Sequence, residues 1–141
     1  MFRIKRRIPF CAGHRVYLHE SKCNNLHGHN YVAIFEVAPR DELDSLGRVI
    51  DFSVIKDELK VWIDENWDHK FILNEIDPAF TALEKINGKE NIYLLKENPT
   101  AEVMAKHLFN VGTELLEPYK VKVVSVYLEE TENCSATFTQ N

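Results

Sequence analysis

The sequence lacks a long apolar run and has few cysteines. Its longest apolar stretch, Tyr31 to Ala38, is interrupted by Glu36 and is far shorter than the roughly 20 residues of a transmembrane helix. The three cysteines form an odd and widely spaced set, which is typical of reduced thiols and not of a disulfide framework. The basic first residues are not followed by the apolar stretch of a signal peptide. We therefore expect a soluble, cytoplasmic protein with no membrane partner.

The sequence also lacks an excess of positive charge. It has 17 Lys and Arg against 22 Asp and Glu, which gives a formal net charge of -5. Binding a nucleic acid backbone depends on many clustered cations, so we expect no nucleic acid partner. A small anionic substrate needs only a few local cations and stays compatible with this charge. The length of 141 residues predicts a single domain over residues 1–141 with one hydrophobic core.

Hydrophobic periodicity predicts an α+β domain. Alternating apolar and polar residues predict strands at residues 2–11, 29–38, 120–129 and 136–138. A helical period predicts one helix over residues 53–65 and a second that begins with Asn98 as its cap and ends before Pro118. Residues 70–97 are expected to form loop with one minor strand. The predicted fold is a four-stranded antiparallel sheet with two helices on one face, in the order ββααββ. Its open edges favour an oligomer.

Three histidines have the spacing of a metal site. His27 and His29 are two residues apart, so in a strand both imidazoles point to the same face. His14 ends the preceding predicted strand and lies beside them if the two strands pair. Three protein ligands with an open fourth position are typical of catalytic zinc, although imidazoles suit other transition metals as well. The spacing alone is equally compatible with ordinary hydrogen-bonded histidines.

A cysteine lies close to these histidines in the chain. Cys23 is four positions before His27 in a polar loop, and a thiol near a divalent cation is readily available as a base or nucleophile. It is also suited to be a fourth zinc ligand, which would close the metal shell. We interpret Cys11 and Cys134 as small buried residues.

Two acidic segments are further candidates. Asp68 and His69 follow the first predicted helix, and an imidazole beside a carboxylate is suited to exchange protons near neutral pH. Glu130 leaves the third predicted strand, where a carboxylate is suited to accept two N–H groups from an aminopyrimidinone edge. For each segment, a solvated loop or strand end is the alternative interpretation.

Several of these segments together resemble one enzyme superfamily. The matching stretches fall in the right order and span most of the chain: Phe10-Cys11-Ala12-Gly13-His14-Arg15, Cys23-Asn24-Asn25-Leu26-His27-Gly28-His29, Val49-Ile50-Asp51-Phe52, Trp67-Asp68-His69-Lys70, Asn98-Pro99-Thr100-Ala101-Glu102 and Glu130-Thr131. In this combination the chain resembles the 6-pyruvoyl-tetrahydropterin synthase and 6-carboxy-tetrahydropterin synthase superfamily.

The resemblance implies a fold, an assembly and a set of roles. It implies a tunnelling fold, in which two-helix, four-stranded subunits join their sheets edge to edge into a barrel, with a hexamer favoured and active sites at subunit interfaces. It implies that Cys23 abstracts a proton, that Glu130 anchors the pterin, and that Thr100 and Glu102 help to line the pterin pocket. The implied zinc ligands are His14, His27 and His29, and the implied proton relay is Asp68 with His69.

The resemblance also implies a substrate, 7,8-dihydroneopterin triphosphate. The spacing C-x3-H-G-H from Cys23 to His29 resembles the branch that releases triphosphate and acetaldehyde and forms 6-carboxy-5,6,7,8-tetrahydropterin on the route to queuosine. The pyruvoyl-forming synthase, of the tetrahydrobiopterin type of pathway, is the alternative within this superfamily. An oligomeric zinc-binding scaffold without turnover is the alternative from another class. Two features depart from the family pattern, namely Trp67 and the extension at residues 77–95, while Arg15 and Lys70 are candidates for binding the triphosphate.

Overall fold

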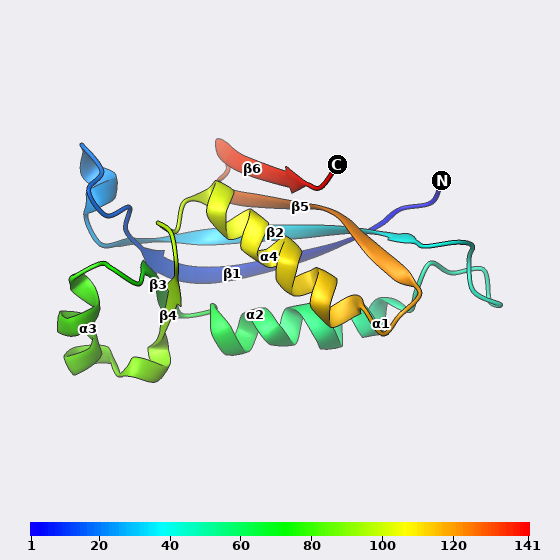
Figure 1. The fold of residues 1–141 in the computed structure, drawn as a ribbon, viewed down its shortest axis with the longest axis horizontal. Coiled ribbons are helices and arrows are strands. Elements are labelled where there is room, and N and C mark those ends of the chain that lie inside the picture. Colours follow the sequence, from blue (N-terminus) through cyan, green and yellow to red (C-terminus); the bar gives the residue numbers. More distant parts are fainter.

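Two long antiparallel strands form the centre of the sheet. In the computed structural model, which describes residues 1–141, β1 (Ile4–His14) pairs with β2 (His27–Pro39) in an unbroken register from Ile4 opposite Val37 to His14 opposite His27. The loop between them contains one short 3-10 turn, η1 (Lys22–Asn24). On its other side β2 pairs with β5 (Val121–Thr131), which pairs with β6 (Cys134–Thr139), both antiparallel (Figure 1).

The predicted four-stranded sheet is wrong, because the segment expected to be loop adds two strands and a helix. Strand β3 (Lys70–Asn74) runs parallel to β1, and β4 (Ile92–Leu95) runs parallel to β3. They are connected by α3 (Ala79–Asn87) and the turn η3 (Lys89–Asn91). The sheet is therefore mixed and six-stranded, in the order β4-β3-β1-β2-β5-β6. The α+β class is correct, but the order ββααββ is not.

The two predicted helices are present with small changes. The first is continuous from residue 52 to 66 and consists of α1 (Phe52–Ile55), the π turn η2 (Lys56–Lys60) and α2 (Val61–Asn66). The second, α4, covers Ala101–Leu116, and its cap is Thr100, whose Oγ1 accepts the Val103 N–H at 3.2 Å. The predicted cap Asn98 is wrong. Its side-chain amide instead donates to the Tyr17 carbonyl oxygen at 3.0 Å.

Alternation along β1 and β2 gives the sheet two different faces. The buried residues Ile8, Phe10 and Ala12 face the helices, and they belong to one core cluster of 22 buried residues. Trp67 is completely buried in this cluster, with its ring stacked on His107 at 5.7 Å. The tryptophan at this position therefore affects the packing of the core and not the surface.

None of the helices is both long and apolar enough to cross a membrane.

A buried ion pair ties the segment after β1 to the start of α3. Arg15 Nε donates to Asp77 Oδ2 at 2.7 Å and Arg15 Nη2 donates to Asp77 Oδ1. Asp77 Oδ1 also accepts the Ala79 N–H at 2.8 Å. The Asp77 side chain is fully buried, and that of Arg15 is 19% exposed. Burial raises the pKa of Asp77, but the hydrogen bonds from Arg15 and Ala79 and the guanidinium charge outweigh it, so the pKa lies below its ordinary value.

Substituting Asp77→Ala is expected to lower the free energy of unfolding by about 3 kcal/mol, because it leaves a largely buried guanidinium without its partner. A lowered carboxyl pKa contributes stability that is complete above its ordinary value of 3.8 and is lost as the pH falls below it. Urea unfolding at pH 7 measures the difference between wild type and variant. The difference should shrink as the pH is lowered to about 3, and a difference independent of pH would contradict this account.

Candidate metal centre and active site

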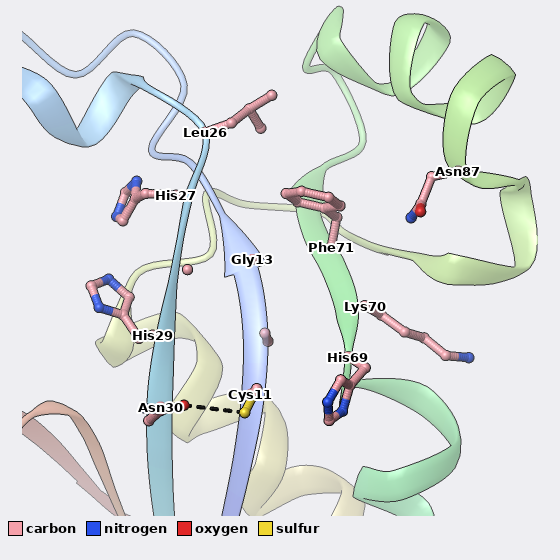
Figure 2. A pocket seen from close by; sticks show the side chains of 12 residues that line it. Cys11, Gly13, Leu26, His27, His29, Asn30, His69, Lys70, Phe71 and Asn87 are labelled. Carbon is pink, nitrogen blue, oxygen red and sulfur yellow. Dashed lines mark hydrogen bonds between the residues drawn. The ribbon is translucent and has the colours of Figure 1, made fainter.

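The register of β1 and β2 brings the three predicted histidines together. His14 lies opposite His27, and His29 lies opposite Ala12 one pair further along. One ring nitrogen from each of His14, His27 and His29 lies within 4.8 Å of the others. Figure 2 shows His27 and His29 projecting to the same side of β2. The strand period and the pairing of the two strands are sufficient to explain this convergence.

Two backbone carbonyls fix the orientation of two of the rings. His14 Nδ1 lies 2.7 Å from the Pro99 oxygen, and His27 Nδ1 lies 2.6 Å from the Asn25 oxygen. A carbonyl oxygen only accepts, so both Nδ1 atoms carry hydrogen and both Nε2 atoms present lone pairs. Carbonyl partners of this kind orient metal-binding histidines. Sequence reasoning missed Asn25 and Pro99 in this role because a backbone carbonyl leaves no signature in residue type.

The donor atoms fit a bound metal ion. The Nε2 atoms of His14 and His27 lie 3.1 Å apart, and two imidazoles on one tetrahedral zinc have nitrogens about 3.3 Å apart, given bonds of about 2.0–2.1 Å. His29 Nε2 is buried and has no hydrogen-bond partner. It lies 3.2 Å from Glu130 Oε1, without the geometry of a hydrogen bond. An orphaned buried nitrogen beside two facing lone pairs is what a three-imidazole metal site requires.

The surroundings favour the neutral form of His14 and His29, the form that metal ligands need. Burial lowers the pKa of His14 to about 4, against the raising effect of its bond to Pro99 and with the help of His27 and His29. Burial also lowers the pKa of His29, although the Glu130 charge opposes this. Beneath the rings, burial and the Glu130 charge raise the pKa of Tyr31, so its hydroxyl stays protonated.

A hollow of about 280 Å³ adjoins His14 on the helix-covered face of the sheet. The predicted residues Cys23, Thr100, Glu102 and Glu130 all line it. Cys23 enters from the loop after β1, Thr100 and Glu102 from the start of α4, and Glu130 from the end of β5. The Cys23 thiol is not part of the convergent set of ligand atoms. The chain therefore places a thiol, two carboxylates and His14 around one small space, while His27 and His29 line a larger hollow.

Asp68 and His69 lie on the other side of the sheet. They adjoin Cys11, and His69 and Cys11 line a second, larger hollow of about 550 Å³ (Figure 2). Cys11 alternates with the core residues Phe10 and Ala12 and so points away from the helices. Within one chain, Asp68 and His69 do not meet Cys23. The prediction that Cys11 is buried is wrong, because both it and Cys134 are exposed; Cys134 lies at the rim, where β6 begins.

The Asp68 and His69 side chains contact each other, and the backbone between them is unusual. His69 Nδ1 lies 2.9 Å from Asp68 Oδ2, while Asp68 Oδ1 accepts the Cys11 N–H at 2.9 Å. Burial raises the pKa of Asp68, but these hydrogen bonds and the nearby positive charges outweigh it, so the pKa is lowered. His69 has a φ of 62°, a left-handed conformation that is costly for a residue with a Cβ and that concentrates at functional sites.

Both candidate cations for a triphosphate are engaged within the chain. The Arg15 guanidinium is paired with Asp77. Lys70 Nζ donates to the carbonyl oxygens of Glu65 at 2.5 Å and Glu90 at 3.0 Å. Lys70 still lines the larger hollow together with Asn87 from the extension at residues 77–95. Neither cation points into the hollow that contains Cys23.

Comparisons with known proteins identify the family of this chain. A family described as 6-pyruvoyl tetrahydropterin synthase matches residues 3–141. The 6-carboxy-5,6,7,8-tetrahydropterin synthase of Rickettsia bellii is 44% identical over 95% of this chain and 97% of its own. The protein of the same name from Aquifex aeolicus is 33% identical over 99% of this chain and 98% of its own.

Solved structures share the fold. A Wolinella succinogenes protein described as uncharacterized has a TM-score of 0.84 at 27% identity, over 99% of this chain and 98% of its own. The 6-pyruvoyl tetrahydropterin synthase of Caenorhabditis elegans has a TM-score of 0.72 at 26% identity, over 99% of this chain and 96% of its own. The family match and the relatives together cover nearly the whole chain, which therefore belongs to the 6-pyruvoyl tetrahydropterin synthase family of enzymes.

Proposed function

We propose that this lyase converts 7,8-dihydroneopterin triphosphate to 6-carboxy-5,6,7,8-tetrahydropterin, releasing acetaldehyde and triphosphate. The observation that carries the proposal is that Cys23 and Glu130 share one hollow with His14, whose ring nitrogen converges with those of His27 and His29. The carboxy product is supported by the names of relatives that are 44% and 33% identical and by the C-x3-H-G-H spacing. A place on a route to queuosine and a cytoplasmic location belong to the same proposal.

In this proposal His14, His27 and His29 hold a zinc ion with their ring nitrogens. When bound, zinc supplies Lewis-acid polarisation of an oxygen on the substrate side chain. Cys23, in the same hollow as His14 but outside the convergent ligand set, is placed to remove a proton from the substrate side chain.

The hollow also has groups suited to orient the pterin ring. Glu130 Oε1 already lies 3.2 Å from His29 Nε2, so a pterin held by this carboxylate lies next to the three-histidine set. A carboxylate with two free acceptor positions matches the two N–H groups of an aminopyrimidinone edge. Glu102 and Thr100 line the same wall, although the Thr100 hydroxyl also caps α4.

We infer that a neighbouring subunit supplies the Asp68–His69 pair. Within one chain this pair lies across the sheet from Cys23, so one chain cannot bring a proton from Cys23 to His69. The outer strands β4 and β6 each leave one edge of the sheet open, and such edges are suited to pairing with other copies. A hexamer with active sites at its interfaces, as the family resemblance implies, would join the two hollows.

Substituting His69→Gly is expected to lower kcat about 100-fold, because it removes a group that relays protons. Stability should be unchanged or slightly higher, since glycine adopts a φ of 62° without strain. Steady-state kinetics and urea unfolding measure the two effects. Asn87→Ala, in the same hollow, is the matched control and should leave kcat unchanged. If activity and stability of His69→Gly fell together, the residue would have a structural role instead.

The proposed reaction is tested by incubating zinc-loaded protein with 7,8-dihydroneopterin triphosphate and analysing the pterin product by mass, with an aldehyde assay in parallel. A carboxypterin with acetaldehyde is expected. A pyruvoyl pterin without acetaldehyde would assign the chain to the activity after which the matching family is named. Unchanged substrate with retained zinc would leave a zinc-binding scaffold as the function.

A further inference from the structure

A second cluster of metal-binding side chains lies outside the three-histidine set. Cys11, Asp68 and His69 each contribute one ligand atom, and the three atoms lie within 4.8 Å of one another. They lie on the face of the sheet that the helices do not cover, where Cys11 and His69 line the hollow of about 550 Å³. Figure 2 shows the Cys11 sulfur and the His69 ring beside each other, across β2 from His27 and His29.

The backbone positions of this cluster are fixed by hydrogen bonds. The Cys11 N–H donates to Asp68 Oδ1 at 2.9 Å, and the His69 N–H donates to the Cys11 carbonyl oxygen at 2.6 Å. The Cys11 thiol donates to Asn30 Oδ1 at 3.1 Å, which orients its sulfur. The β1 end and the loop after α2 are therefore held together before any ligand arrives, so little ordering is needed for binding.

The side-chain ends keep enough freedom to close around an ion. The His69 side chain is 76% exposed and that of Asp68 is 28% exposed, so the imidazole turns without disturbing the core. Ligand atoms on one tetrahedral zinc lie about 3.3–3.8 Å apart, given bonds of about 2.0–2.3 Å. Starting from separations of at most 4.8 Å, side-chain movements of up to about 1.5 Å close the set.

The donor atoms select the class of metal. A thiolate sulfur with an imidazole nitrogen suits zinc and other thiophilic divalent ions, whereas magnesium and calcium prefer oxygen ligands alone. Three protein ligands leave the fourth position to water. We propose that Cys11, Asp68 and His69 form a second site for a thiophilic divalent metal, which fills after the three-histidine site.

The second site has a consequence for catalysis that depends on the proposed function. A metal on His69 and Asp68 occupies the ring nitrogen and the carboxylate lone pair that the proton relay uses. Zinc beyond one equivalent therefore inhibits the enzyme, and the half-inhibiting concentration rises at least 10-fold in Cys11→Ser. Binding at the second site without inhibition would overturn the relay role of His69, while the site itself would stand.

Cobalt titration of the metal-free full chain tests the site directly. Cobalt bound by three imidazoles absorbs weakly in the visible, whereas a thiolate ligand adds a sulfur-to-cobalt charge-transfer band in the near ultraviolet. The expected result is binding of two equivalents, with the charge-transfer band developing only during the second. Cys11→Ser should lose the band and the second equivalent and keep the first.

Two variants make the result specific. Cys134→Ser removes an exposed thiol outside both clusters and should change neither equivalent. Cys23→Ser should also retain the band. The proposal is overturned if only one equivalent binds, or if the band survives in Cys11→Ser and disappears in Cys23→Ser, because the sulfur ligand would then belong to the three-histidine site. None of these readouts depends on turnover, so a failure of the proposed reaction would be seen separately.

Discussion

Substituting Cys23→Ala is expected to lower kcat/KM about 1,000-fold while the bound zinc is retained, because a positioned proton acceptor contributes about 100- to 10,000-fold. The thiol lines the hollow beside His14 but is outside the convergent ligand set, so its removal leaves three imidazoles for the metal. The measurements are steady-state kinetics with 7,8-dihydroneopterin triphosphate and zinc content by elemental analysis after dialysis.

Cys134→Ala is the matched control for this prediction. Cys134 lines the same hollow but lies at its exposed rim, so its loss should change kcat/KM by less than about 2-fold, as for most surface substitutions. Loss of zinc from Cys23→Ala would show that the thiol is a fourth ligand. In that case the metal shell is closed, and a structural or resting role for the metal becomes the better interpretation.

Substituting His27→Ala is expected to reduce bound zinc from one equivalent to almost none and to lower kcat/KM by at least about 1,000-fold, since Lewis-acid catalysis is worth several kcal/mol. His27 is preferable to His14 for this test because His14 is 1% exposed, so that truncating it would also open a cavity in the core. Competition with a chromogenic chelator measures the zinc affinity.

His19→Ala separates loss of a ligand from general disturbance of the loop. His19 lines the same hollow as Cys23 and is outside the convergent set. The His19→Ala protein should therefore keep one equivalent of zinc. A His27→Ala protein that binds zinc as tightly as wild type would contradict the proposed metal centre, whatever its activity.

The long elements were predictable from the sequence and the short ones were not. Strands β1, β2 and β5 contain 11 or more residues each, so a period of two is visible along them. Strands β3 and β4 have five and four residues, which is too short for a period to be recognised. Strand β3 pairs with β1 and β4 pairs with β3, and such contacts between separate segments leave no local pattern.

The site was predictable where it depends on strand geometry. The i and i+2 spacing of His27 and His29 and the position of His14 before the loop indicated the three-histidine set, which the family resemblance then implied. It was harder to predict on which face of the sheet each site residue lies, because placing Asp68 and His69 requires knowledge that β3 pairs with β1. The exposure of Cys11 could have been predicted from the sequence, because alternation with the inward-facing Phe10 and Ala12 turns its side chain outward.

The register of β1 and β2 decides whether the three imidazoles can converge at all. A slip of one residue in this ladder turns every side chain of one strand to the opposite face. His14 would then lie across the sheet from His27 and His29, and Gly13, which now packs against the Phe71 ring, would exchange places with it. A chain with the shifted register would thus have no three-imidazole set, so the same strand pairing that builds the core also builds the candidate metal centre.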